Sequence, residues 1–187
     1  MKIKTVLAVL LALMLEAQAQ AAGDRLVFYR IGESGQEAWT LLKVYFEGKG
    51  YGVTIVQGET VIEKHVEKVN RINRGSGGVF LAMELIPGKS GRVMVAESDA
   101  KKVEGRILAI DEIPARFARE SDRLAADVAA AFNVKVKHLP LFPLLGVAMP
   151  GIVVKLEFSE GETTDVIAKL FRGVETYFSE RIKKDEK

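Results

Sequence analysis

The 187-residue sequence contains no cysteine, only two histidines and a single tryptophan. Without cysteine the chain has no disulfide, no thiolate nucleophile and no cysteine-ligated metal, so its fold must rest on a hydrophobic core. The 27 basic and 25 acidic residues leave a net charge of +2, and the longest basic cluster is the short tail at residues 181–184. This balance argues against nucleic acid as a partner.

The first 22 residues have the organisation of a secretory signal peptide. Lys2 and Lys4 precede an apolar run over residues 5–15, and the small-residue segment that follows offers cleavage after Ala19 or Ala21. The run is about half as long as a membrane span, which needs roughly 20 residues. We therefore predict a periplasmic or secreted protein with no stable membrane insertion after cleavage, and a single domain over residues 23–187.

Strand and helix patterns alternate along the mature chain. Apolar runs bounded by glycine or proline predict strands at 26–29, 53–56, 79–86, 92–96, within 134–145 and at 149–158. Apolar residues spaced three to four apart predict helices over 37–49, 61–72, 114–133 and 166–182, while residues 101–110 fit either a strand or a loop. The predicted fold is α/β, a three-layer αβα arrangement with a mostly parallel central sheet of about six strands.

Residues 149–158, MPGIVVKLEF, form an apolar run that proline and glycine open and that contains one lysine, Lys155. The pattern predicts a buried strand that carries this lysine toward its carboxyl end. Ligands of open α/β sheets bind beyond the carboxyl ends of the strands. Lys155 therefore lies where chemistry is expected.

Other segments extend this pattern. PLFPLLGVAMP at 140–150 runs directly into GIVVKLEF at 151–158, INR at 72–74 precedes VFLAME at 79–84, and GYGV at 50–53 opens the second strand. Together these segments resemble the zinc-dependent N-acetylmuramoyl-L-alanine amidases of the cell-separation type. That family carries a P-L-x-V-L-R-x-x-x-M-P-A-V-L-V-E-L-G-F segment, an F-V-S-I-H-A-N strand and a G-Y-x-V strand entry. The resemblance spans nearly the whole mature chain at low identity.

The resemblance implies cleavage of the amide between N-acetylmuramic acid and the first L-alanine of the peptidoglycan stem. In such enzymes two histidines and one glutamate hold zinc, and another glutamate is the general base. The base position falls on Lys155 in this sequence. The histidine positions fall on Glu33 and on Glu84, or on Met83 with a shifted gap, and the glutamate ligand corresponds to Glu37.

The chain thus departs from the family at both histidine positions and at the base position. An ordinary lysine is protonated at neutral pH and cannot accept a proton as a general base. We predict that Lys155 forms an ion pair with Glu84 or Glu33 and so replaces the charge of the metal. No catalytic residue, zinc or other cofactor is expected, and the candidate cleft residues are Ser34, Trp39, Met83 and Glu157.

Two alternatives remain. If Glu33, Glu37 and Glu84 converge, three carboxylates would suit Mg²⁺, Mn²⁺ or Ca²⁺, and the protein would be a divergent metal-dependent hydrolase acting on peptidoglycan. Alternatively, it is an interaction domain that ignores peptidoglycan. The working hypothesis is an exported noncatalytic domain, binding or regulatory, whose partner is peptidoglycan or a cell-wall protein.

The two histidines do not restore a zinc site. His65 lies on the inner stripe of a predicted helix, and His138 precedes the turn at Pro140. Neither occupies a ligand position of the family that the sequence resembles. We therefore predict that each is a core or surface histidine.

Overall fold

The computed structural model describes residues 25–33, 35–75, 77–88, 91–99 and 109–185. The predicted signal peptide, Ser34 and most of the ambiguous segment 101–110 lie outside these residues. Within the described part, all strands belong to one six-stranded sheet with the order β2-β1-β3-β6-β4-β5. The predicted α/β class, with a mostly parallel central sheet between helices, is confirmed.

The strands are β1 (Arg25–Arg30), β2 (Gly52–Gln57), β3 (Val79–Pro87), β4 (Val93–Ser98), β5 (Val136–Leu139) and β6 (Gly151–Phe158). Neighbouring strands are parallel except β4 and β6, which pair in antiparallel fashion. Only residues 88–92 separate β3 from β4, whereas a parallel crossover needs a dozen or more residues. The chain therefore reverses direction there, and β6 later inserts between β3 and β4.

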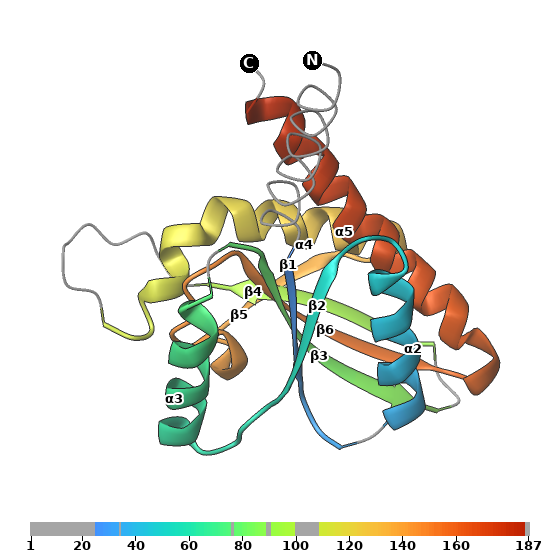
Figure 1. The fold of residues 1–187 in the computed structure, drawn as a ribbon, viewed down its shortest axis with the longest axis horizontal. Helices are drawn as coiled ribbons and strands as arrows, with labels where there is room; N and C mark the ends of the chain where they lie inside the picture. The colour runs from blue at the N-terminus through green and yellow to red at the C-terminus, as the bar shows by residue number, and fades with distance from the viewer. Residues whose placement is uncertain (1–24, 34, 76, 89–90, 100–108, 186–187) are drawn as a thin grey trace, which may run out of the picture.

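Helices cover both faces of the sheet (Figure 1). One face packs against α2 (Gln36–Glu47), α4 (Ala118–Phe132) and α5 (Thr163–Asp185), and the other packs against α3 (Ile62–Asn73) and residues 142–149. A 3₁₀ turn, η1 (Ile113–Phe117), leads into α4, so the helix predicted from Pro114 begins as 3₁₀. Two further 3₁₀ turns are η2 (Phe142–Leu144) and η3 (Glu160–Glu162).

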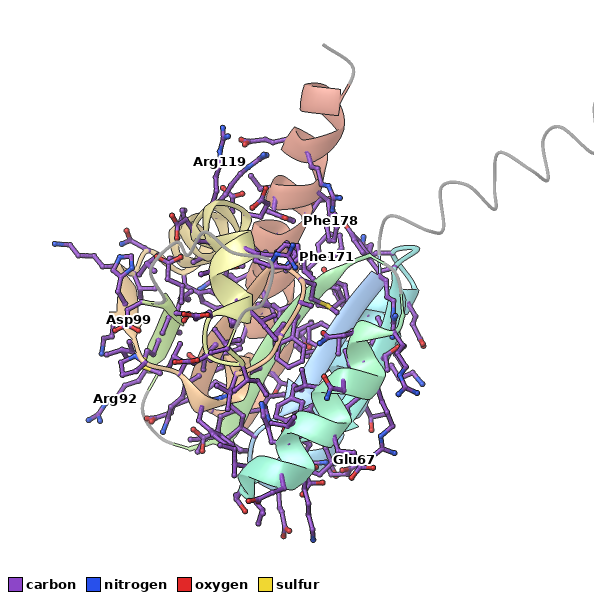
Figure 2. All side chains as sticks on the ribbon, turned by 90° about the vertical axis from the view of Figure 1, so that its left-hand side faces the viewer. Glu67, Arg92, Asp99, Arg119, Phe171 and Phe178 are labelled. Atoms are coloured by element: carbon purple, nitrogen blue, oxygen red, sulfur yellow. The ribbon has the colours of Figure 1, made fainter. Side chains whose placement is uncertain are left out.

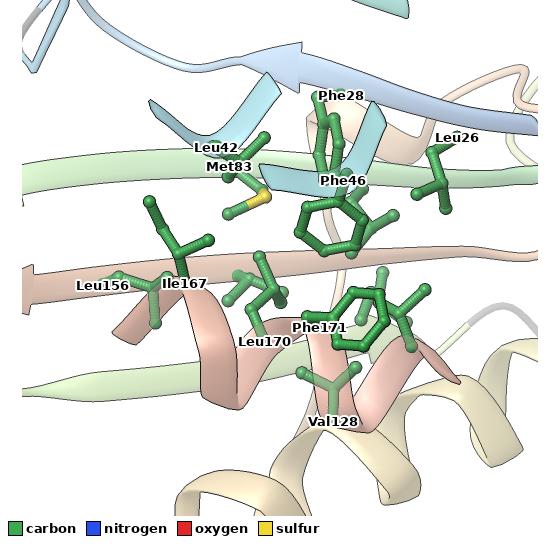
Figure 3. Packing of buried hydrophobic residues seen from close by; sticks show 14 of the residues in the cluster. Leu26, Phe28, Leu42, Phe46, Met83, Val128, Leu156, Ile167, Leu170 and Phe171 are labelled. Atoms are coloured by element: carbon green, nitrogen blue, oxygen red, sulfur yellow. The ribbon is translucent and has the colours of Figure 1, made fainter. Parts of the chain in front are cut away.

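The larger core fills the space between the sheet and α2, α4 and α5. Phe46 contacts Phe28 with ring centroids 5.3 Å apart and Phe171 at 5.4 Å, so aromatic packing joins β1, α2 and α5 (Figure 3). Charged side chains such as Glu67 and Arg92 lie at the periphery instead (Figure 2). None of the described helices combines the length and apolarity that crossing a membrane requires.

On the face of the sheet that packs against α3, part of the surface is not covered. The candidate site lies in this uncovered part. Val69 and Ile72 of α3 pack against Phe80 and Ala82 of β3, together with Val153 of β6. Beyond that row, toward the carboxyl ends of β3 and β6, the same face carries partly exposed residues. Because successive side chains of a strand alternate between faces, Glu84, Lys155 and Glu157 all belong to this open area.

Candidate functional site

An ion cluster lies at the carboxyl ends of the two central parallel strands. Glu84 and Lys155 are direct neighbours in the β3–β6 register. The Lys155 Nζ lies 3.2 Å from Glu84 Oε2 and 3.7 Å from Glu157 Oε1. The predicted ion pair between Lys155 and Glu84 is therefore confirmed.

The cluster is only partly shielded from water. About a third of each side chain is exposed for Lys155 and Glu84 (36% and 32%), and 20% for Glu157. At such a boundary the Coulomb attraction between an ammonium group and two carboxylates is stronger than in an ion pair at the open surface, and weaker than in a fully buried ion pair. Lys155 is thus a cation that lies between two carboxylates at this end of the sheet.

A shallow hollow of about 270 Å³ adjoins the cluster. Lys155 and Glu157 line it together with Arg92, Met94 and Lys137, which come from β4, β5 and the turn before β4. Three of these five side chains are basic and one is acidic. The hollow therefore offers cationic donors to an anionic group that approaches the carboxyl ends of the strands.

The three carboxylates of the alternative metal site do not converge. Glu84 lies on the α3 face, whereas Glu37 belongs to the first turn of α2 on the opposite face, where it lines a separate hollow of about 730 Å³. Glu33 is exposed, and its backbone oxygen accepts a hydrogen bond from the Arg30 guanidinium. The described residues contain no group of three or more potential ligands arranged for a metal, so the convergence that this alternative requires is not found among them.

Two of the candidate cleft residues are in the core instead. Met83 has no exposed surface and Trp39 only 2%, and both pack between the sheet and the helices. Figure 3 shows Met83 beside Leu42 of α2. Strand alternation explains why Met83 lies in the core, because its side chain must point to the opposite face of the sheet from Glu84. Glu157 does line a hollow, and Ser34 lies outside the described residues.

His65 is a core histidine, as predicted. Its Nδ1 accepts a hydrogen bond from Tyr29 Oη at 2.7 Å, and its Nε2 donates to the Leu145 carbonyl at 3.0 Å, which is the tautomer that satisfies both partners. Burial lowers the pKa of His65, while the hydrogen bond to Leu145 opposes this shift. The neutral imidazole therefore joins β1, α3 and the segment before β6.

A buried carboxyl was missed by the sequence reasoning. Glu97 on β4 is 2% exposed, and its Oε1 lies 2.7 Å from Nδ1 of His138 on the edge strand β5. Burial, aided by the nearby Asp122 carboxyl, raises the pKa of Glu97 to about 8. The alternation of Val93, Val95 and Glu97 could have revealed it, because it puts Glu97 on the same face as the buried Val95.

The Lys155 cluster gives a direct prediction. In the presence of a chelator, the Lys155→Glu variant should lose about 1–3 kcal/mol of unfolding free energy, because it places a third carboxylate between Glu84 and Glu157. Millimolar Ca²⁺ should restore part of this loss, since Ca²⁺ accepts several carboxylate oxygens. Urea unfolding with and without Ca²⁺ measures both effects.

The matched control is Lys155→Met, which removes the ammonium group without adding a carboxylate. Its stability should not respond to Ca²⁺. If Lys155→Glu unfolds at the same urea concentration as the unchanged protein, Lys155 does not hold the two carboxylates together.

No protein-family profile matches the chain, and a search of curated proteins gives no significant similarity. The α/β architecture is therefore established by the structure, and the amidase resemblance stays a prediction made from the residues.

Proposed function

We propose that this chain is an exported, noncatalytic domain of amidase-like architecture that binds peptidoglycan. The signal-peptide pattern of the first 22 residues supports export, and the segments around 72–84 and 140–158 support the architecture. One observation carries the noncatalytic part of the proposal. Lys155 forms ion pairs with Glu84 and Glu157 at the strand ends where the resemblance requires a metal ligand and a carboxylate base.

The chemistry of such an amidase explains why this observation matters. A catalytic zinc needs electron-pair donors around an open position, and its attacking water needs a base that can take up a proton. An ammonium group ion-paired with the neighbouring carboxylates repels a dication and already carries its protons. The same positive charge, with Arg92 and Lys137 beside it, suits the carboxylates of a peptidoglycan stem peptide.

Co-sedimentation with purified sacculi, followed by analysis of the supernatant, tests both parts of the proposal. We expect the protein to sediment with sacculi and to release no soluble muropeptides, with or without added Zn²⁺. The double variant Arg92→Gln/Lys137→Gln should bind at least about fivefold more weakly, because it removes two donors from the hollow. The control Arg172→Gln changes an exposed charge on α5, across the sheet, and should bind normally.

Two results would overturn the proposal in different ways. Muropeptide release that a chelator abolishes would identify a divergent metal-dependent hydrolase. A failure to sediment would identify an interaction domain that ignores peptidoglycan.

A further inference from the structure

Another cavity lies at the opposite end of the sheet from Lys155. It has a volume of about 570 Å³ and is bordered by Gly78 and Pro150, which directly precede β3 and β6. Its other walls come from η1, α4 and the C-terminal half of α5. Figure 2 shows Arg119 of α4 near this part of α5. The volume falls within the range of small-molecule sites, roughly 300–1,000 Å³.

The charged lining of this cavity is mainly basic. Arg119, Arg123 and Arg181 line it, against a single acidic side chain, Glu120. Within the part of the chain that the structure describes, neither Arg119 nor Arg181 forms an ion pair. Two guanidinium groups are therefore available to an incoming anion.

Arg123 is held in place at the cavity wall. Its Nη2 lies 2.7 Å from Glu180 Oε2 and 3.4 Å from the Tyr177 carbonyl oxygen, and its guanidinium lies over the Tyr177 ring, 5.6 Å from the centroid. Its Nε atom, however, is buried with no hydrogen-bond acceptor among the described residues. A buried donor without a hydrogen-bond partner is costly.

Apolar surface completes the cavity. Tyr177 and Met149 are buried residues at its wall, and Phe117 contributes a second aromatic side chain. Apolar walls with a few convergent polar donors are the usual composition of a small-molecule site. The arginines would fix the orientation of a ligand, and the aromatic wall would bury its apolar part.

We propose that this cavity binds a small organic oxyanion, a carboxylate or phosphate ester attached to an apolar body. Guanidinium groups recognise both kinds of oxyanion because their N–H donors form a planar fork. This site lies at the other end of the sheet from the proposed peptidoglycan contact and does not depend on that function. Its ligand can therefore bind whether or not the protein sediments with sacculi.

Isothermal titration of the purified protein with three probes tests the site. N-acetylphenylalanine carries a carboxylate and an apolar ring, its amide is the uncharged equivalent, and phenyl phosphate carries the alternative oxyanion. We expect at least one of the two anions to bind at least tenfold more tightly than the amide. The tighter of the two anions identifies the class of the natural ligand.

Variants of the cavity then locate the binding. Arg119→Gln/Arg181→Gln should weaken the anion at least tenfold, and both side chains are exposed enough for the fold to be retained. The control Arg172→Gln, on α5 but outside the cavity, should bind normally. Equal binding of the amide, unchanged binding by the double variant, or no binding of either anion at millimolar concentration would overturn the proposal.

Discussion

Replacing Glu97 with glutamine is expected to make the protein more stable than the unchanged chain at pH 9, by on the order of 3–5 kcal/mol. The unfolded chain releases the Glu97 proton near the ordinary value of 4.5, whereas the folded protein keeps it until about pH 8. Between these values the folded state binds more protons, so stability falls as pH rises and the decline ends above about pH 8. Glutamine keeps the shape and has no proton to lose.

The comparison between the two proteins isolates Glu97 from other titrating groups. His65 acts in the opposite sense, because its lowered pKa adds stability as pH rises through the ordinary histidine value of about 6.5. That contribution is common to both proteins and cancels in their difference. At pH 5 the two should have nearly equal stability, since a protonated carboxyl and an amide can each donate a hydrogen bond to the Asp122 side chain.

Urea unfolding at pH 5, 7 and 9 provides the measurement, with Glu175→Gln as the control for an exposed carboxylate on α5. If the difference between Glu97→Gln and the unchanged protein is the same at all three pH values, Glu97 is already ionised at pH 5 in the folded protein.

The second large effect is expected at the crossing of α4 and α5. A Cβ atom on Gly173 would lie 2.6 Å from the Val128 Cα and 3.0 Å from the Asp127 carbonyl oxygen, which are backbone atoms that cannot turn aside. Gly173→Ala should therefore cost about 2–3 kcal/mol, even though alanine favours a helix by about 1 kcal/mol over glycine. The two helices must separate to admit one methyl group.

Gly161 provides the matched control, because a Cβ atom there would meet nothing within 4 Å. Gly161→Ala should leave stability unchanged within about 0.5 kcal/mol or raise it slightly. Thermal and urea unfolding of both variants measure the contrast. Equal stability of Gly173→Ala and the unchanged protein would mean that the crossing is looser than these distances require.

Local patterns predicted the elements well, and their failures have a common origin. Short apolar runs and three-to-four spacing located all six strands and the four helices to within a few residues, because those signals depend on neighbouring residues. The antiparallel direction of β4 follows from the few residues that separate it from β3. The insertion of β6 between β3 and β4 is a long-range event that no local signal contains.

The candidate site was partly predictable for the same reason. An ion pair of Lys155 with Glu84 or Glu33 was predicted because the resemblance puts these residues at the base and metal positions, and the strand register brings Lys155 beside Glu84. Alternation already placed Met83 opposite to Glu84, but it did not say which face the core helices cover. The arginine-lined cavity joins segments that are distant in sequence, so only the folded chain reveals it.

The position of β6 also determines when the sheet can be completed. β3 pairs with β6 along eight residues and β4 pairs with its other side, so β6 joins a half formed by β2, β1 and β3 to a half formed by β4 and β5. Both halves present an unpaired edge until residues 151–158 have been synthesised. The fold is therefore completed late, after most of the chain has emerged, and a chain truncated before residue 151 would be prone to edge-to-edge association. The strand that carries Lys155 is thus also the one that joins the two halves of the sheet.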